Sequence, residues 1–371
     1  MRQGTVYIIS NIDRWVAFEW LATAFAESGE PITFILMNRG DSHMQGWLQA
    51  EGHTVHHVRW RGNKDYPSAL LALWKLLRRI KPKTVHCHFL HATVVGLTAA
   101  WLLGIKQRIY TRHHSTFHHD YAPKGVWLDK YSNRLATHIL AITSMVKGIL
   151  MQREQVPEHK IHIMHHGFRF EDFLSVSDTD VAALRANYQL PAEKKVIGVV
   201  ARHIRWKGVQ YIAEAFVALH KENPGLVLFL ANAKGDYHQH ILDILAPLPA
   251  ESYRIVTFEP AIEQLFYLFD YYVHTPVNPE IEAFGQTYVE ALACARPGIF
   301  TMAGIAPDFI RHERNALVVP FEDAEAIRTA LLRLMDDATL AQRIAAQGRE
   351  DVLNQFSFEQ MFANLRSIYT A

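Results

Sequence analysis

The chain has 371 residues and a formal net charge of +1, from 38 Lys and Arg against 37 Asp and Glu. This length suffices for two domains, and 49% hydrophobic with 20% charged residues is typical of a globular protein. No apolar run reaches the roughly 18 residues of a membrane span. Only Cys87 and Cys294 are present, which excludes a disulfide framework and favours the cytoplasm. The opening run Val6–Ile9 is strand-like, so we expect no signal peptide.

Charge is unevenly distributed along the chain. Residues 1–180 contain 21 Lys and Arg and 15 Asp and Glu, whereas the remainder contains 17 and 22. Sixteen of the 22 histidines also lie in residues 1–180. The basic N-terminal part is compatible with peripheral contact at an anionic membrane or with an acidic acceptor. An uneven spread over solvated faces explains the imbalance equally well, and the basic stretch Ser68–Lys83 also fits an ordinary helix beside a sheet.

Short apolar strands alternate with helices through the first 165 residues. Strands are expected at Val6–Ser10, Ile32–Met37, His53–Val58, Thr84–His88, Arg108–Thr111, Ile139–Ile142 and Ile161–Met164. Helices are expected at Trp15–Ser28, Met44–Glu51, Ser68–Ile80, Ala92–Leu103, Asp129–Ala136 and Ser144–Gln152. This alternation predicts an α/β fold with a doubly wound parallel sheet.

A second alternating region follows a linker at residues 171–193. Asp178 and Asp180 in the linker are interpreted as the N-cap and a first-turn acid of a helix, not as metal ligands. Strands are expected at Lys195–Val200, Leu226–Leu230, Arg254–Phe258, Tyr271–His274 and Gly298–Thr301. Helices are expected at Val209–Leu219, Gln286–Ala293, Asp323–Met335, Leu340–Gln355 and Phe358–Tyr369.

The segment from Glu282 to Glu290, EAFGQTYVE, carries the most distinctive pattern. Gly285 opens a helix that runs from Gln286 towards Arg296-Pro297-Gly298, and a helix start of this kind favours bound phosphate. Glu282 precedes the glycine, while Glu290 lies one turn beyond Gln286. Two carboxylates therefore flank a predicted anion site, which suits a ligand with hydroxyls at both ends and phosphates in the middle.

These residues resemble the signature of the retaining GT-B glycosyltransferases of the family-4 type, the glycosyl transferases group 1. Tyr110-Thr-Arg-His113, Ile142-Thr-Ser144 and the Arg202 to Lys207-Gly208 spacing are similar to further segments of that family. The resemblance implies two Rossmann-like doubly wound domains facing across a cleft. The implied division is 1–170 for acceptor binding, the linker 171–193, 194–352 for nucleotide-sugar binding, and 353–371 as a helix packing back on the first domain.

The resemblance also implies roles for individual residues. Arg202 and Lys207 would bind the donor diphosphate, with Glu282 and His113 completing the catalytic set. The donor-binding residues would be Arg202, Lys207, Glu282, Phe284, Gly285, Gln286 and Glu290. No metal or other cofactor is expected, and a UDP-sugar is favoured over a GDP-sugar. The chain departs from the family at His166 and Arg169, and at Ser10–Arg14, where the family has Gly-Gly, which leaves the acceptor undefined.

The histidines suggest an alternative. His86, His88 and His91, or His113 to His119, resemble the ligand clusters of a metal-dependent hydrolase, although no acidic residue replaces Leu90. A non-catalytic binding subunit with the same fold is a second alternative. Neither a dinucleotide-binding glycine motif nor a nucleic-acid module is present. We therefore predict a metal-independent, retaining glycosyltransferase of bacterial polysaccharide or glycolipid assembly, cytoplasmic or peripheral at the inner membrane face, using a nucleotide-sugar donor and a glycan or lipid-linked acceptor.

Overall fold

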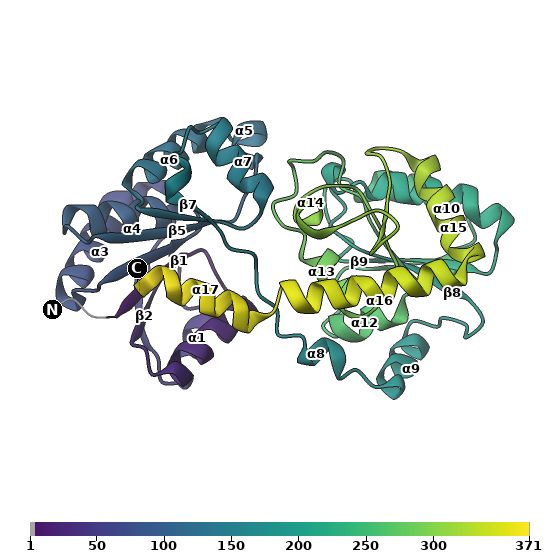
Figure 1. Ribbon diagram of the computed structural model, residues 1–371, viewed down its shortest axis with the longest axis horizontal. Helices are drawn as coiled ribbons and strands as arrows, with labels where there is room; N and C mark the ends of the chain where they lie inside the picture. The colour runs from purple at the N-terminus through teal and green to yellow at the C-terminus, as the bar shows by residue number, and fades with distance from the viewer. Residues whose placement is uncertain (1–3, 371) are drawn as a thin grey trace. The chain divides into compact units, whose positions relative to one another are not determined.

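The structure, a computed structural model, describes residues 4–370 and divides them into two compact units (Figure 1). One unit runs up to Phe168 and includes the segment from Phe358 onwards, and the other comprises Arg169–Ser357. The predicted linker 171–193 thus belongs to the second unit, and the returning segment begins at Phe358 instead of residue 353. None of the helices in the described residues combines the length and apolar character needed to cross a membrane.

The first unit is built on a seven-stranded parallel sheet in the order β3-β2-β1-β4-β5-β6-β7. Its strands are β1 Thr5–Ser10, β2 Ile32–Asn38, β3 Thr54–Arg59, β4 Thr84–His88, β5 Gln107–Arg112, β6 His138–Ala141 and β7 Ile161–Ile163. The direction of winding reverses between β1 and β4. Ligands of open α/β sheets bind at the carboxyl ends of the strands at such a switch point.

Helices cover both faces of this sheet. They are α1 Val16–Ser28, α2 His43–Ala50, α3 Tyr66–Ile80, α4 Leu90–Leu102, α5 Phe117–Tyr121, α6 Pro123–Leu135, α7 Ser144–Gln152 and α17 Phe358–Thr370. Phe25 of α1, Met44 of α2 and Leu365 of α17 share one apolar cluster with Tyr7 of β1. The last helix is also held by polar contacts, because the ammonium of Lys83 donates to the carbonyl of Tyr369 at 2.9 Å.

The second unit contains a six-stranded parallel sheet in the order β10-β9-β8-β11-β12-β13, with its switch point between β8 and β11. The strands are β8 Lys195–Val200, β9 Leu226–Ala231, β10 Tyr253–Val256, β11 Tyr271–His274, β12 Gly298–Phe300 and β13 Leu317–Val318. The helices are α8 Glu171–Leu174, α9 Asp178–Asn187, α10 Val209–Glu222, α11 His238–Leu245, α12 Ile262–Leu268, α13 Gln286–Ala293, α14 Ala306–Phe309, α15 Ala324–Asp336 and α16 Ala338–Gln355.

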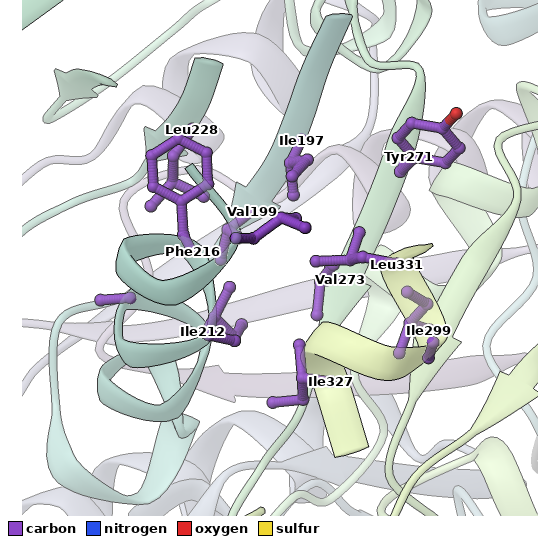
Figure 2. Packing of buried hydrophobic residues seen from close by; sticks show 14 of the residues in the cluster. Ile197, Val199, Ile212, Phe216, Leu228, Tyr271, Val273, Ile299, Ile327 and Leu331 are labelled. Carbon is purple, nitrogen blue, oxygen red and sulfur yellow. The ribbon is translucent and has the colours of Figure 1, made fainter. Parts of the chain in front are cut away.

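The core of the second unit is formed by the apolar faces of helices packed against apolar side chains of the sheet. Ile212 and Phe216, one turn apart on α10, are buried with Ile197 and Val199, which alternate on β8 (Figure 2). Ile327 of α15 joins the same buried cluster. The doubly wound arrangement predicted from the alternating pattern is thus confirmed for both units.

Several local predictions were incomplete or wrong. Helix α6 begins at Pro123, six residues before the predicted start at Asp129. The elements α5, α8, α11, α12, α14 and β13 were not predicted. Short 3₁₀ turns are also present at Asn63–Asp65, Glu158–Lys160, Arg205–Lys207 and Ala250–Ser252. The predicted N-cap Asp178 lies inside the first turn of α9. Ser177 caps the helix instead, because its hydroxyl accepts from the amide of Asp180 at 3.1 Å.

Candidate active site

The loops after β8 and β11 meet at the switch point of the second sheet. The chain leaves β8, forms the 3₁₀ turn Arg205–Lys207 and enters α10 at Gly208. Gly208 has φ +73°, and a Cβ there would lie 1.8 Å from the carbonyl oxygen of Thr275. Only glycine allows this conformation and this approach. The backbone thereby brings the Lys207 turn against the residues that follow β11.

Lys207, Glu282 and His274 form a buried charged group, the Lys207 cluster. The Lys207 ammonium pairs with the Glu282 carboxylate, and His274 Nε2 lies 3.6 Å from the same oxygen. Burial by itself would raise the pKa of Glu282, but the neighbouring ammonium and imidazole hold it at about 2. Burial lowers the pKa of His274, and Lys207 lowers it further. Glu282 is therefore a carboxylate at neutral pH and can accept hydrogen bonds from sugar hydroxyls.

Two cations share one aromatic ring beside this cluster. The Arg202 guanidinium carbon lies 5.7 Å from the centre of the Trp206 ring, and the Lys207 ammonium lies 4.8 Å from it. Arg202 is exposed, whereas Trp206 and Lys207 are half-buried. The indole holds the two predicted diphosphate-binding cations near each other, since cation–π contacts of this length are attractive.

Helix α13 begins next to Glu282, as predicted. Gly285 has φ +80°, and a Cβ there would approach the Tyr288 ring to 2.6 Å and Glu282 Cγ to 3.3 Å. The side chain of Phe284 is 4% exposed, so it anchors the loop and does not face solvent. Gln286 is the first residue of the helix, where the backbone N–H groups favour an anion. Lys207, Glu282 and the start of α13 therefore belong to one site.

Glu290 lies on the second turn of α13 and is half-buried. Burial and the nearby negative charge of Glu263 raise its pKa to about 7. The fold therefore favours the protonated Glu290 carboxyl. This preference contributes its full stability below the ordinary glutamate pKa, and the contribution is lost as pH rises through about 7.

We therefore expect Glu290→Gln to remove part of the pH dependence of stability. The wild-type melting temperature should fall between about pH 5 and pH 8 more steeply than that of the variant, because only the wild type must ionise a buried carboxyl. Thermal melts of both proteins across this range measure the difference. The exposed Glu193→Gln in the same unit is the control. Parallel curves for wild type and Glu290→Gln would contradict the assignment.

His113 follows β5 in the first unit, apart from the other predicted site residues, which all lie in the second unit. Its Nε2 is 3.0 Å from His88 Nδ1, and its ring stacks with that of His166 at 5.7 Å between centroids. These side chains and Trp15 line a cavity of about 70 Å³ at the carboxyl edge of the first sheet. Burial, together with the neighbouring histidines, keeps the pKa of His113 well below its ordinary value. The site therefore offers neutral imidazoles at neutral pH.

The family departures noted in the sequence have local structural roles. His166 forms part of the His113 cavity wall. The loop that replaces Gly-Gly is fixed by Asn38, whose amide donates to the carbonyl of Ile12 at 2.7 Å and accepts from its amide at 3.0 Å. His166 and the loop after β1 thus have defined positions in the first unit.

The predicted histidine clusters are held by hydrogen bonds. His86 contacts the hydroxyls of Tyr369 and Thr111 at 2.6 and 2.9 Å. His114 and His118 approach one oxygen of Asp129 at 3.1 and 2.6 Å. These last three side chains bring ligand atoms close enough to hold a metal ion.

Asp129 also has a permanent cation beside it. Arg112 lies 3.1 Å from the other oxygen of this carboxylate, within a buried pair. Burial would raise the Asp129 pKa, but the two histidines and Arg112 hold it well below its ordinary value. The carboxylate is thus satisfied by protein donors.

Sequence reasoning missed His274 and Trp206. His274 is the last residue of β11, at the carboxyl edge of the sheet beside its switch point. The strand was predicted, so this position was a detectable signal. Trp206 lies between the two predicted cations in sequence, but its position between them in space depends on the 3₁₀ turn, which was not predicted.

Comparison with known proteins defines the class of this fold. A model described as Glycosyltransferase Family 4 matches residues 19–172, and one described as Glycosyl transferases group 1 matches residues 180–351. The structure resembles Anabaena Alr3699/HepE in complex with UDP, with a TM-score of 0.84 and 16% identity over 99% of both chains. The two doubly wound units are accordingly those of a GT-B fold.

Curated relatives agree with this class. The chain is 25% identical over 318 residues to the capsular polysaccharide biosynthesis glycosyltransferase CapM of Staphylococcus aureus, covering 81% of this chain and 80% of that protein. It is also 25% identical over 193 residues to the GDP-mannose-dependent alpha-(1-6)-phosphatidylinositol monomannoside mannosyltransferase of Mycobacterium tuberculosis, covering 50% of this chain and 49% of that protein. The chain belongs to the GT-B glycosyltransferases of the family-4, group 1 type.

Proposed function

We propose that this glycosyltransferase moves a sugar from a nucleoside-diphosphate donor to an acceptor hydroxyl with retention of anomeric configuration. The observation that carries the proposal is the Lys207 cluster beside the glycine-started helix α13, at the switch point of the second sheet. Cations and a helix start suit a diphosphate, while an ionised glutamate suits sugar hydroxyls. UDP is the favoured nucleotide because HepE is described in complex with it, although the mycobacterial relative is GDP-mannose-dependent.

The reaction breaks the bond between the sugar anomeric carbon and the β-phosphate oxygen. The electron pair leaves with the diphosphate, and Arg202, Lys207 and the start of α13 stabilise this growing negative charge. The acceptor oxygen attacks from the same face, and its proton passes to the departing phosphate oxygen. Glu282 holds the sugar hydroxyls, Phe284, Gly285 and Gln286 shape the pocket around them, and Glu290 accepts hydrogen bonds from the ribose. His113 orients the donor sugar.

The acceptor in this proposal is a bacterial polysaccharide or glycolipid, since CapM acts in capsular polysaccharide biosynthesis. The first unit holds the acceptor, and the enzyme works in the cytoplasm or at the inner membrane face. No metal is required, because the protein's own cations neutralise the diphosphate.

The deciding experiment measures donor binding and product stereochemistry. UDP- and GDP-sugars are screened by thermal shift, since a donor that binds only the folded state at 100 times its Kd stabilises by about 2.7 kcal/mol. Transfer from the best donor should continue in chelator and give a product with the donor's anomeric configuration by NMR. Glu290→Ala should weaken UDP binding in calorimetry, with the exposed Glu193→Ala as control. Loss of transfer in chelator would favour the metal-dependent alternative, and an inverted product would exclude retention.

A further inference from the structure

Exposed aromatic side chains gather on one part of the first unit. Six Phe, Trp or Tyr side chains are exposed within residues 4–370, and one of them, Phe258, lies in the second unit. The other five lie on three consecutive helices, α4, α5 and α6, and we call them the aromatic face: Trp101, Phe117, Tyr121, Trp127 and Tyr131. Trp127 is 77% exposed. A grouping of this kind marks an interaction surface more often than a scattered set does.

Helix α6 reverses the usual amphipathic pattern. Its buried positions include Asp129, Ser132 and Asn133, whereas Trp127 and Tyr131 point outward. A helix on a soluble protein normally buries its aromatic residues and exposes its carboxylates and amides. The fold therefore does not require aromatic residues at these two positions, and their exposure needs another explanation.

Hydrogen bonds and ion pairs hold the helices that carry the aromatic face in place. The Tyr131 hydroxyl lies 2.9 Å from Thr98 Oγ1 on α4, which connects α6 to the helix whose last turn carries Trp101. Beneath the face, Asp129 of α6 contacts His118 of α5 and the buried guanidinium of Arg112. The aromatic side chains consequently project from an anchored surface.

Positive charge surrounds the aromatic face. Between Trp101 and Arg134 the exposed charged residues are basic with one exception: Lys106, Lys124, Lys130 and Arg134 against Asp120. On α6, Lys124, Trp127, Tyr131 and Arg134 are spaced three or four residues apart and so share one side of the helix. This combination complements an anionic partner that also accepts aromatic rings.

A cavity of about 560 Å³ opens beside the same helix. Trp127, Tyr131, Lys130 and Arg134 line it together with Lys160, whose ammonium donates to the carbonyl of Ala136 at 3.0 Å. Glu154 also lies in the wall, but its carboxylate is already bonded to Arg112 and Asn133. The cavity therefore offers a ligand aromatic rings and basic side chains, which suit a phosphate group on an organic carrier.

We propose that the aromatic face docks on an anionic phospholipid bilayer and that the cavity receives a lipid phosphate. Trp and Tyr favour the depth of the lipid headgroups, where their rings are buried and their polar atoms stay hydrated. The basic side chains add attraction to the anionic surface. This docking goes beyond the proposed sugar transfer and does not depend on it, because the donor site lies in the other unit.

Vesicle flotation tests the proposal with the full-length protein. Vesicles containing phosphatidylglycerol should carry the protein, vesicles of phosphatidylcholine alone should carry much less, and added salt should release it. Each basic side chain near such a surface contributes about fivefold to partitioning, so Lys124→Gln/Lys130→Gln/Arg134→Gln should lower it by about 100-fold. Trp127→Ser/Tyr131→Ser should weaken binding at any salt concentration.

A charge-matched control lies on α3 of the same unit. Lys75→Gln/Arg78→Gln/Arg79→Gln removes three exposed cations as well, but leaves the aromatic face intact. Equal losses from both triple variants would overturn the proposal in favour of unspecific attraction. Absent vesicle binding, with dimerisation that Trp127→Ser/Tyr131→Ser abolishes in sedimentation, would assign the face to a second copy. The variants of the aromatic face should keep the melting curve and the UDP affinity of the wild type. A failure of membrane docking can then be told apart from a failure of the proposed sugar transfer.

Discussion

Lys207→Ala is expected to lower the rate of sugar transfer by about 10²–10³-fold, the usual effect of removing one preorganised donor to a charge that develops in the transition state. Lys207 reaches a buried carboxylate, shares Trp206 with Arg202 and sits at the end of a loop fixed by Gly208. Steady-state kinetics with the donor found by screening measures the effect. An exposed lysine at the end of α10 provides the control, Lys221→Ala.

Loss of Lys207 should also destabilise the second unit, because Glu282 would be left buried without its cation. The double variant Lys207→Ala/Glu282→Gln should recover the melting temperature but not the rate. Recovery of the melting temperature would show that Lys207 stabilises the second unit through Glu282, and the rate of the single variant Lys207→Ala measures its part in catalysis. A Lys207→Ala enzyme with a kcat within twofold of wild type would remove Lys207 from the mechanism.

Arg112→Met is expected to destabilise the first unit by about 3–5 kcal/mol, the cost of breaking a buried ion pair by removing one partner. The Arg112 side chain is 1% exposed and pairs with Asp129 at 3.1 Å and Glu154 at 2.5 Å. Methionine fills similar space but leaves two buried carboxylates without a cation. Chemical denaturation, monitored by hydrogen exchange of the β5 and β6 amides, measures the loss of stability within this unit.

The destabilisation caused by Arg112→Met should change with pH in a defined direction. The depressed pKa of Asp129 means that its pairing stabilises the fold above the unfolded-state pKa, and this stabilisation is lost as pH falls through the folded-state pKa. The difference in the free energy of unfolding between wild type and Arg112→Met should therefore become smaller at acid pH. Arg314→Met is the control, since its partner Asp351 lies at 3.2 Å but Arg314 is exposed, and such pairs contribute below about 1 kcal/mol. A difference in the free energy of unfolding that does not depend on pH would contradict the role of Asp129.

The strands were the most predictable part of the fold. β4, β8 and β11 have the predicted bounds. β8 is a mainly apolar run after Lys195, whereas β4, Thr-Val-His-Cys-His, is buried throughout although it contains two histidines. The start of α6 was missed for a physical reason: its first turns bury Gly125 and Asp129, so hydrophobic periodicity is absent there. The capping of α9 by Ser177 also required coordinates, since Ser177 and Asp178 are both ordinary capping residues.

The candidate site was partly predictable. Lys207, Glu282 and Gly285 were predicted from sequence motifs and their resemblance to the family, and the structure places them together. The resemblance assigned Lys207 and Glu282 to different parts of the donor, whereas the structure shows them paired with each other. That pairing depends on how closely two loops approach at Gly208, which is a tertiary property. His274 joins the pair only because β11 is adjacent to β8.

The position of α17 determines the order in which the two units can be completed during synthesis. The Tyr369 hydroxyl contacts Tyr7 and His86, and the carbonyl of Ile368 accepts from Gln107. The first unit therefore lacks part of its core until α17 has left the ribosome, while Arg169–Ser357 is already continuous. A nascent chain arrested before α17 should complete its second unit and leave its first unit open, so an arrest at that point selectively endangers the earliest-made residues.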